Sequence, residues 1–416
     1  LSSGKNSRLY QRLVYNEQLV STVSAYVSGY EIAGTFEISA MVNPGVDEDK
    51  VNAIIDEELA KFLKNGPTRK ELERVKIQNI SGFIRALEKV GGFGGKSDLL
   101  ASNYSYNGDP SFYQKELEWV KEATHKDLKN TAVKWLSDGL YHLEIRAYPE
   151  MQSIDTGVDR SGIPVPGTPP IAAFDSFERA ELSNGLKVIF ARRDTIPTIQ
   201  MQVSLDAGYA SDQFGKPGTA KLAMNMLDEG TKRRSTLEIN EELILLGASI
   251  STGSNLDTSF VSLSTLTSTL DNSLDLFADV VLNPSFPEEE LERLRLQLIT
   301  GISREQQSPL AMAQRVLPEL LYGKKHAYGN PRTGSGTVSS VKSITLDEIR
   351  NFHKTWFKAN HATMIIVGDT TLDIMLPKLE KAFGKWQSGS IPTKNISEVP
   401  QQDHTSIYLV DRPGSE

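Results

Sequence analysis

The chain has 416 residues, of which 39% are hydrophobic and 24% charged, and its formal net charge at pH 7 is −8. This length allows two or three domains with a sizeable core, and the composition is ordinary for a globular protein. The negative charge argues against a nucleic-acid partner. The absence of cysteine excludes disulfides, thiolate metal sites and cysteine nucleophiles. No apolar run reaches the roughly 18 residues of a membrane span, so we expect no membrane partner.

The first part of the chain alternates between helical and strand-like patterns. The expected elements are a helix over 5–19, strands over 20–27 and 34–42, helices between 51 and 135, and a strand over 140–148. One of these helices begins after Thr68, with Glu71 in the position of a capping box. Residues 149–175 are rich in proline, glycine and serine and predict an extended linker.

The patterns after this linker predict a second folded body. The expected elements are a hairpin turning at 184–185, a strand over 199–205, helices over 218–230 and 236–246, a hairpin of 249–254 with 259–266, helices beginning at 270, 287 and 311, a strand over 362–367, a helix over 372–386 and a strand over 406–410. A polar, proline-bearing stretch at 387–403 predicts a second linker. Helices between antiparallel runs indicate an α+β fold, in which mostly antiparallel sheets pack against helices.

The two bodies share an internal repeat. Residues 71–82 match 290–301 with seven identities in twelve positions, and 124–135 match 345–356 in the same order. Both matches have nearly the same offset of about 220 residues, which predicts one α+β unit used twice. At this offset the first copy lacks its opening strands, while Ser406–Val410 has the pattern of an opening strand. We therefore expect the chain to be a fragment of a longer protein.

Four motifs resemble one known family. Leu182–Val188 resembles its opening Leu-x-Asn-Gly-Leu-x-Val hairpin, His326–Gly334 its His-Pro-Tyr-Gly-x-Pro-x-x-Gly loop, and Phe352–Asp369 its closing helix and strand. Ser7–Gln11 resembles the Ser-Arg-Leu-Phe-Gln opening of the family's second type of unit. The chain is thus similar to the pitrilysin/insulinase-type (inverzincin) zinc metallopeptidases. The resemblance implies the non-catalytic portion of a tandem bacterial member.

The resemblance also implies a pitrilysin/processing-peptidase-like fold of repeated units. The implied divisions are an incomplete second-type unit at 1–150, a Pro/Gly-rich linker at 151–178, a complete inactive unit at 179–388, a linker at 389–403 and the opening strand of a further unit at 404–416. Because the first unit lacks opening strands, its sheet is expected to have a free edge. We expect the tail strand at 406–410 to dock there, within one molecule or by exchange in a dimer.

The family carries its metal on the helix expected here at 218–230. Active members have His-x-x-Glu-His, in which two histidines bind zinc and the glutamate is the general base. These positions are Lys221, Met224 and Asn225 in this chain, and the family's third ligand, a glutamate on a later helix, corresponds by spacing to Gly301. Catalytic zinc needs three protein ligands with N, O or S donors. The degenerate positions supply no imidazole and no carboxylate, so we predict no catalytic, metal-binding or cofactor-binding residue in this chain.

A second family feature is also missing. Active members bind substrate with an Arg and a Tyr seven residues apart after the Ser-Arg-Leu-Phe motif, and these positions are Val14 and Ser21 here. The resemblance implies that the parent protein is a zinc metalloendopeptidase whose zinc lies in an upstream catalytic half. This chain alone is then expected to be inactive.

Two functions of different classes follow from these observations. The first is the non-catalytic half of a clamshell peptidase, which contributes chamber wall, binds extended peptide and has the catalytic half of the same protein as its partner. The alternative is a non-enzymatic peptide-binding or assembly subunit, which would resemble the core proteins of respiratory complexes. A His-x-x-Glu-His motif upstream in the parent reading frame would favour the first. We expect a periplasmic or otherwise exported protein, with the cytoplasm as the alternative.

The other chemistry-bearing residues are expected to have structural roles. These are the histidines His326, His353 and His361 as hydrogen-bonding or packing groups, Asp228 and Glu229 as solvated loop acids, Lys232–Arg234 as a solvated turn, and Trp135 and Trp356, at equivalent repeat positions, as core residues. Nothing else in the sequence resembles a Ser/His/Asp triad, a phosphate loop or a paired-carboxylate site.

Overall fold

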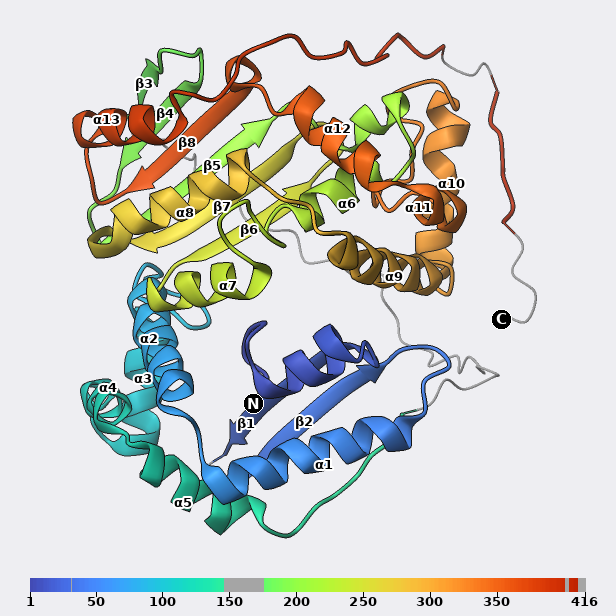
Figure 1. The fold of residues 1–416 in the computed structure, drawn as a ribbon. Helices are drawn as coiled ribbons and strands as arrows, with labels where there is room; N and C mark the ends of the chain where they lie inside the picture. Colours follow the sequence, from blue (N-terminus) through green and yellow to red (C-terminus); the bar gives the residue numbers. More distant parts are fainter. Residues whose placement is uncertain (31, 146–175, 401–403, 411–416) are drawn as a thin grey trace.

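The computed structural model describes residues 1–30, 32–145, 176–400 and 404–410 (Figure 1). Residues 1–145 form a first body and residues 176–400 a second one. Both combine helices with mostly antiparallel strands, so the predicted α+β fold class is confirmed. No helix in the described ranges is long and apolar enough to cross a membrane.

The first body is a two-stranded hairpin with helices around it. Its elements are the π-helix η1 (Tyr10–Asn16), β1 (Val20–Gly29), β2 (Gly34–Val42), α1 (Glu48–Asn65), α2 (Arg69–Ala86), α3 (Lys96–Asn107), α4 (Tyr113–Glu122) and α5 (His125–Leu136). The strands pair antiparallel, from Val20 opposite Val42 to Gly29 opposite Gly34. A small core joins η1, the hairpin and α1, and consists of Leu9, Leu13, Val14, Leu19, Val20, Val51 and Ile54.

A polar cap fixes the start of α2 and ties it to the beginning of the chain. The Thr68 hydroxyl accepts the Glu71 N–H at 3.2 Å, and the Glu71 carboxylate accepts the Thr68 N–H at 2.6 Å, which confirms the predicted capping box. The same carboxylate binds the Arg8 guanidinium at 2.7 Å. Burial opposes ionisation of Glu71, but Arg8 and the cap bonds outweigh it and lower the pKa of Glu71 to about 2.

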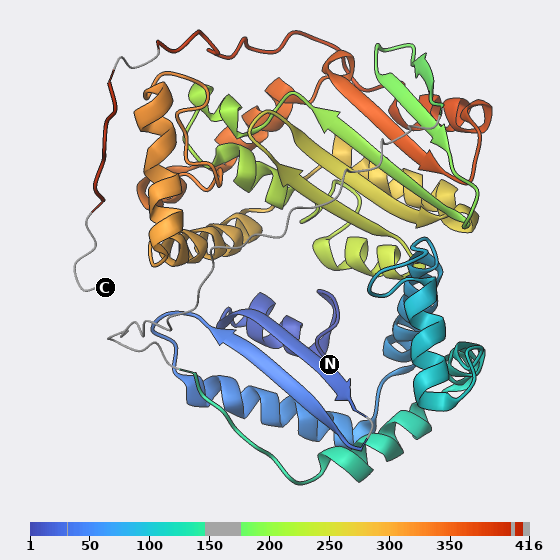
Figure 2. The ribbon, with the colours of Figure 1, turned by 180° about the vertical axis from the view of Figure 1, so that it is seen from behind.

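The second body is built on a six-stranded sheet. Its elements are β3 (Glu178–Glu181), β4 (Lys187–Arg192), β5 (Thr198–Leu205), η2 (Tyr209–Phe214), α6 (Thr219–Met226), α7 (Thr236–Leu245), β6 (Ser249–Ser254), β7 (Ser259–Leu266), η3 (Thr267–Thr269), α8 (Leu270–Leu282), α9 (Glu288–Glu305), α10 (Pro309–Tyr322), α11 (Val338–Ser343), α12 (Leu346–Trp356), η4 (Ala359–His361), β8 (Ala362–Gly368) and α13 (Leu372–Phe383). The strand order is β3-β4-β8-β5-β7-β6, and only β4 and β8 are parallel neighbours. Helices α8 and α13 cover one face of the sheet, and Figure 2 shows the opposite face.

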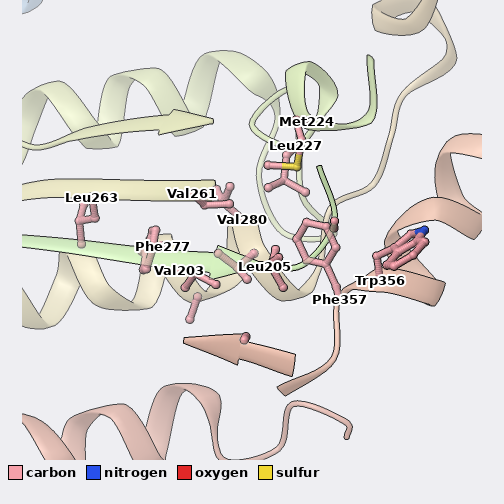
Figure 3. Close-up of a cluster of buried hydrophobic side chains, with 14 of the residues drawn as sticks. Val203, Leu205, Met224, Leu227, Val261, Leu263, Phe277, Val280, Trp356 and Phe357 are labelled. Atoms are coloured by element: carbon pink, nitrogen blue, oxygen red, sulfur yellow. The ribbon is translucent and has the colours of Figure 1, made fainter. Parts of the chain in front are cut away.

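The main core lies between this sheet and its helices. Strand side chains alternate with period two, so every second residue of β5 and β7 points to the same face. Val203, Leu205, Val261 and Leu263 thereby meet Phe277 and Val280 of α8 (Figure 3). The far end of the same cluster is closed by Met224, Leu227, Trp356 and Phe357. Helix α6 is therefore part of the core itself.

The start of α6 depends on a buried carboxylate. Asp212 accepts the N–H of Gly218 at 2.7 Å and the N–H of Ala220 at 2.8 Å. Burial raises the pKa of Asp212 to about 7, although these two donors favour the charged form. Gly218 has φ of +99°, a left-handed conformation that favours glycine, and a Cβ there would lie 3.1 Å from the Ser335 carbonyl oxygen.

The internal repeat is visible in the order of the elements. A hairpin followed by two long helices occurs as β1-β2-α1-α2 in the first body and as β6-β7-α8-α9 in the second, and α5 and α12 close the two series. The environments differ, however. Trp356 of α12 is 3% exposed, whereas Trp135 of α5 is 66% exposed, so the prediction of a core position for Trp135 was wrong. The physical reason is that the hairpin of the first body has no counterparts of β4, β5 and β8 among the described strands, so α5 has less to pack against.

Three other predictions are wrong or fall partly or wholly outside the described residues. The strand expected over 140–148 is absent from residues 140–145, and the rest of it lies outside the described residues. The 149–175 linker also lies outside them. Residues 404–410 form no strand, and Ile407 and Leu409 are each 92% exposed, so docking of the tail on the first body within one molecule was wrong. The tail-exchange dimer stays a prediction.

The stretch before the tail is fastened to the second body. The backbone carbonyl oxygen of Asn395 accepts the Ala327 N–H at 2.9 Å, and its backbone N–H donates to Gln213 Oε1 at 2.8 Å. The Asn395 side-chain amide donates to the Lys325 carbonyl oxygen at 2.9 Å. Lys394 binds the Asp206 carboxylate. Part of the 387–403 stretch, which the sequence predicts to be a linker, is thus held against the second body.

The two tryptophans predict unequal costs of truncation. Trp356→Ala should lower the free energy of unfolding of the second body by about 3–5 kcal/mol, because it opens a cavity in the main core. Trp135→Ala should cost less than about 1 kcal/mol, because the ring is mostly in water. Urea unfolding of the two variants measures both values. Equal losses would show that the first body buries Trp135 in solution.

Candidate functional site

The degenerate metal positions on α6 are occupied by packing and hydrogen-bonding groups. Met224 is 1% exposed and points into the core beside Leu227 (Figure 3). Lys221 donates from Nζ to the Thr333 carbonyl oxygen at 3.1 Å. Asn225 lies one turn further along the helix and is half-buried. The three positions that the resemblance assigns to metal chemistry thus have packing or hydrogen-bonding roles or a half-buried amide.

The fourth position, Gly301, lies on α9, and α9 packs directly against α6. The structure therefore brings together the two helices that the family resemblance pairs. A Cβ built at Gly301 meets nothing within 4 Å, so the site of the missing third ligand is open space. One turn later Glu305 does carry a carboxylate. It binds Arg315 and accepts hydrogen bonds from the hydroxyls of Thr333 and Ser335 at 3.2 and 3.0 Å.

These residues do not fit a catalytic zinc ion. Lys221 offers an ammonium group and Gly301 no side chain, while Asn225 offers only a neutral amide, which is not among the usual zinc donors. Within the described ranges, no group of three or more His, Asp or Glu side chains is arranged to hold a metal ion. We derive no catalytic step through a metal in this chain.

The positions of the missing substrate-binding pair lie in the first body. Val14 is 2% exposed and belongs to the small core, so it is not available to a substrate. The Ser21 hydroxyl accepts a hydrogen bond at 3.0 Å from Arg304 of α9. Because α9 also carries Gly301, one helix contacts both α6 and the position where the second-type unit would hold its tyrosine.

The histidines have the environments of structural residues. His326 Nε2 lies 3.1 Å from the Ser397 carbonyl oxygen, and its Nδ1 accepts the Tyr328 N–H at 3.0 Å. His353 Nε2 donates to the Val281 carbonyl oxygen at 2.9 Å, and its ring centroid lies 4.2 Å from that of Phe357. His361 is exposed at the start of β8. The three side chains do not form one site.

The acids expected to be solvated are instead part of a buried ion cluster at the junction of the two bodies. Lys5 Nζ lies 3.3 Å from Asp228 and 2.9 Å from Glu229, and Arg293 Nη2 lies 2.7 Å from both Glu229 and Glu290. Glu229 is 3% exposed, so its prediction as a solvated acid was wrong. Burial alone would lower the pKa values of Lys5 and Arg293, but the facing carboxylates outweigh it and raise both.

The turn at Lys232–Arg234 is also more structured than predicted. Arg234 binds Glu242 at 2.9 Å, Asp275 at 3.0 Å and the buried Asp279 at 2.8 Å. Arg233 binds the same two aspartates at 3.2 Å each. The run therefore fastens this loop to α7 and α8. Lys232 and Arg233 are exposed as predicted, whereas Arg234 is mostly buried.

Two family models match the chain. The model of the peptidase M16 inactive domain matches residues 1–79 and 343–416, and that of insulinase (peptidase family M16) matches residues 187–334. The fold and these two matches define a peptidase-like domain. The chain belongs to peptidase family M16, the insulinase family, which confirms the family predicted from the motifs.

Known proteins support this assignment. The probable mitochondrial-processing peptidase subunit beta of Arabidopsis thaliana is 26% identical over 234 residues, which cover 55% of this chain and 43% of that protein. The zinc protease PqqE of Helicobacter pylori is 23% identical over 242 residues, covering 57% and 54%. The solved peptidase M16 inactive domain of Pseudomonas fluorescens is 27% identical with a TM-score of 0.50 and covers 53% of each chain. The chain spans about half the length of the curated relatives it matches.

Restoring the donors should restore metal binding only when all of them are present. The combined variant Lys221→His, Met224→Glu, Asn225→His and Gly301→Glu should bind one zinc per chain, because α6 and α9 already pack together. The variant that keeps Gly301 should bind zinc at least roughly tenfold more weakly, since it lacks the third ligand. Zinc titration with a competing chelator measures both affinities.

The wild-type chain is the control for this comparison and should take up no stoichiometric zinc. One zinc per wild-type chain bound at 221–225 would overturn the assignment of a degenerate site. Equal affinity of the two variants would show that Gly301 does not mark the position of the third ligand.

His353 predicts a pH dependence of stability. Burial lowers the pKa of His353 to about 4, from an ordinary value of 6.5, despite its hydrogen bond to a carbonyl oxygen. As pH falls from 6.5 towards 4, the unfolded chain gains a proton that the folded chain does not. Stability is therefore lost over this window, by at most about 1.4 kcal/mol per pH unit.

Urea unfolding at pH 7 and pH 5 tests this expectation. His353→Gln keeps a side-chain donor and cannot titrate, so the variant should lose less stability than the wild type between the two pH values. An identical loss in both proteins would show that His353 is protonated as easily in the folded state as in the unfolded one.

Proposed function

We propose that this chain is the non-catalytic half of a clamshell zinc metallopeptidase, with the zinc in another half of the parent protein. The observation that carries the proposal is the pairing of α6 and α9 without metal donors: the architecture of a catalytic unit is present, and Lys221, Asn225 and Gly301 replace its chemistry. The match to an inactive M16 domain supports it. The catalytic half would then be the chain's main partner.

The proposed contribution of this half is chamber wall and peptide binding. Strand β6 forms one edge of the six-stranded sheet, with no described strand on its outer side. An edge strand presents unpaired N–H and C=O groups, to which an extended peptide can add as a further strand. Apart from Ile250, the side chains of β6 are small, since the other residues of Ser249–Ser254 are serine, threonine and glycine. Such an edge would accept peptides with little selection by sequence.

The junction of the two bodies suits a contact that opens and closes. Polar and charged groups dominate it, including Lys5, Glu229 and Arg293, together with Lys70 bound to Glu241 at 2.6 Å. Interfaces between domains that are rich in polar groups allow relative motion more readily than large apolar ones. This supports the clamshell as the mode of action of the parent protein.

A second candidate is a non-enzymatic subunit that binds peptides or holds an assembly together. It is favoured by the same absence of donors and by the similarity to one subunit of a processing peptidase. A His-x-x-Glu-His motif upstream in the parent reading frame would decide for the peptidase half. Its absence would decide for the assembly subunit. Export to the periplasm stays a prediction under both.

Peptide binding along β6 can be tested with N-methylated peptides. In an edge-bound strand, alternate N–H groups point to the protein and to solvent. One set of alternate N-methyl substitutions should therefore weaken binding of a labelled extended peptide by roughly tenfold or more, because each removes a ladder hydrogen bond. The complementary set should leave affinity nearly unchanged, and fluorescence anisotropy measures all three peptides. Equal binding of both methylated sets would exclude recognition by strand addition.

A further inference from the structure

Residues 140–145 follow α5 and form an exposed segment with the side-chain pattern of a strand; we call it the acceptor segment. Three apolar residues alternate with two polar ones, and the apolar side chains are between 65% and 89% exposed: Tyr141, Leu143 and Ile145. His142 Nε2 lies 3.9 Å from Glu144 Oε1, so the two polar side chains share one side of an extended chain. No described strand pairs with this segment. Its apolar side therefore faces water.

The internal repeat shows which strand the acceptor segment corresponds to. Carrying the match of 124–135 with 345–356 forward puts residues 141–145 at the position of 362–366 in β8. The three apolar residues then take the positions of β8 residues that are all buried in the main core, namely Ala362, Met364 and Ile366. In the second body β8 lies between β4 and β5. The described residues of the first body include no counterpart of either neighbour.

The tail segment, residues 404–410, carries the pattern of β4. Its four consecutive apolar residues match Val188–Ala191 of β4, whereas β5 alternates apolar residues with glutamine at the corresponding place. Such continuous apolar runs are typical of strands that pair in parallel and are covered on both faces. Ile407 and Leu409 then take the positions of Val188 and Phe190. The two β4 residues are each 1% exposed, whereas the two tail residues are each 92% exposed.

The second body shows how two strands of this kind fit together. β4 and β8 pair in parallel, with Val188 opposite Met364 and Phe190 opposite Ile366. All four side chains belong to the main core. The tail segment and the acceptor segment are the counterparts of these two strands, and in Figure 1 both run outside the two sheets. The chain thus carries both members of a strand pair that it has not formed.

We propose that the tail segment of one molecule pairs in parallel with the acceptor segment of a second copy, which returns the same exchange. The register of β4 with β8 places Ile407 opposite Leu143 and Leu409 opposite Ile145. Side chains of neighbouring strands that lie on one face cover each other, so each pair removes four exposed apolar side chains from water.

The partner is a second copy because the tail segment lies apart from the acceptor segment of its own molecule. The preceding stretch is held by the second body through Asn395 and through the Ser397 carbonyl oxygen, which lies 3.1 Å from His326 Nε2. An exchange in both directions uses the same contact twice and closes a dimer with twofold symmetry. No further copy is then needed to cover the two apolar segments.

Cysteine cross-linking between two variants of the full chain tests the exchange, because the chain has no cysteine of its own. Leu143→Cys and Ile407→Cys are mixed and oxidised, so a disulfide between the two positions can form only between molecules. Neighbouring strands lie about 4.8 Å apart, which is within the Cα separation that a disulfide spans. We expect a cross-linked dimer, in which mass spectrometry identifies the peptide that joins positions 143 and 407.

Two matched variants control for random contact. Tyr408→Cys replaces Ile407→Cys and should react with Leu143→Cys roughly tenfold more slowly, because its Cβ points to the opposite face of the strand. Phe93→Cys replaces Leu143→Cys and should react with Ile407→Cys only at the background rate, although Phe93 is 98% exposed. Equal rates in either comparison would overturn the proposed pair.

Two further measurements separate exchange between copies from pairing within one chain. A disulfide that forms inside monomers of the double variant Leu143→Cys, Ile407→Cys would overturn the exchange. Sedimentation equilibrium should show a concentration-dependent dimer of the wild type. Leu409→Ser should weaken this dimer by roughly tenfold or more, and Tyr408→Ser by less than about threefold, because only Leu409 faces the acceptor residues. A wild type that stays monomeric, or equal effects of the two variants, would overturn the proposal.

Discussion

The burial of α6 is the constraint on which the rest of the second body depends. Six of its eight residues are buried: Thr219, Ala220, Leu222, Ala223, Met224 and Met226. The helix packs against β6, α9 and α12 at once. Removing α6 would expose the core to water, and this holds whether or not the helix carries catalytic residues. This packing needs no metal donors: Met224, at the position that the resemblance assigns to the general base, contributes apolar packing.

The local signals in the sequence predicted most of the fold. The hairpin at Asn184-Gly185, the alternation in β5 and the capping box at Thr68 each depend on residues close together in the chain. The family followed from short motifs for the same reason, and the degenerate site stays a prediction. Periodicity also predicted helices on either side of the site, and α6 and α9 do pack together.

The failures at Glu229 and Trp135 concern contacts between distant residues. Glu229 looked solvated because its partner Lys5 is 224 positions away in the chain. Trp135 looked buried by analogy with Trp356, but a repeat in sequence does not guarantee the same neighbours, and the first body has two described strands where the second has six. No local signal in the sequence could have exposed the first error, because Arg293 follows Glu288, Glu289, Glu290 and Glu292 and therefore has the pattern of an exposed, charged helix face.

The stretch from Lys394 to Ser397 has a mechanical consequence. Its hydrogen bonds to Gln213, Lys325 and Ala327 hold it against η2 and the loop between α10 and α11, so its direction is set by the second body. The chain therefore departs from the second body at a fixed point, Ser397. A force applied to the tail would act first on the His326 loop, through Ser397, and on the end of β5, through Lys394 and Asp206. The second body would therefore receive such a force at two places at once.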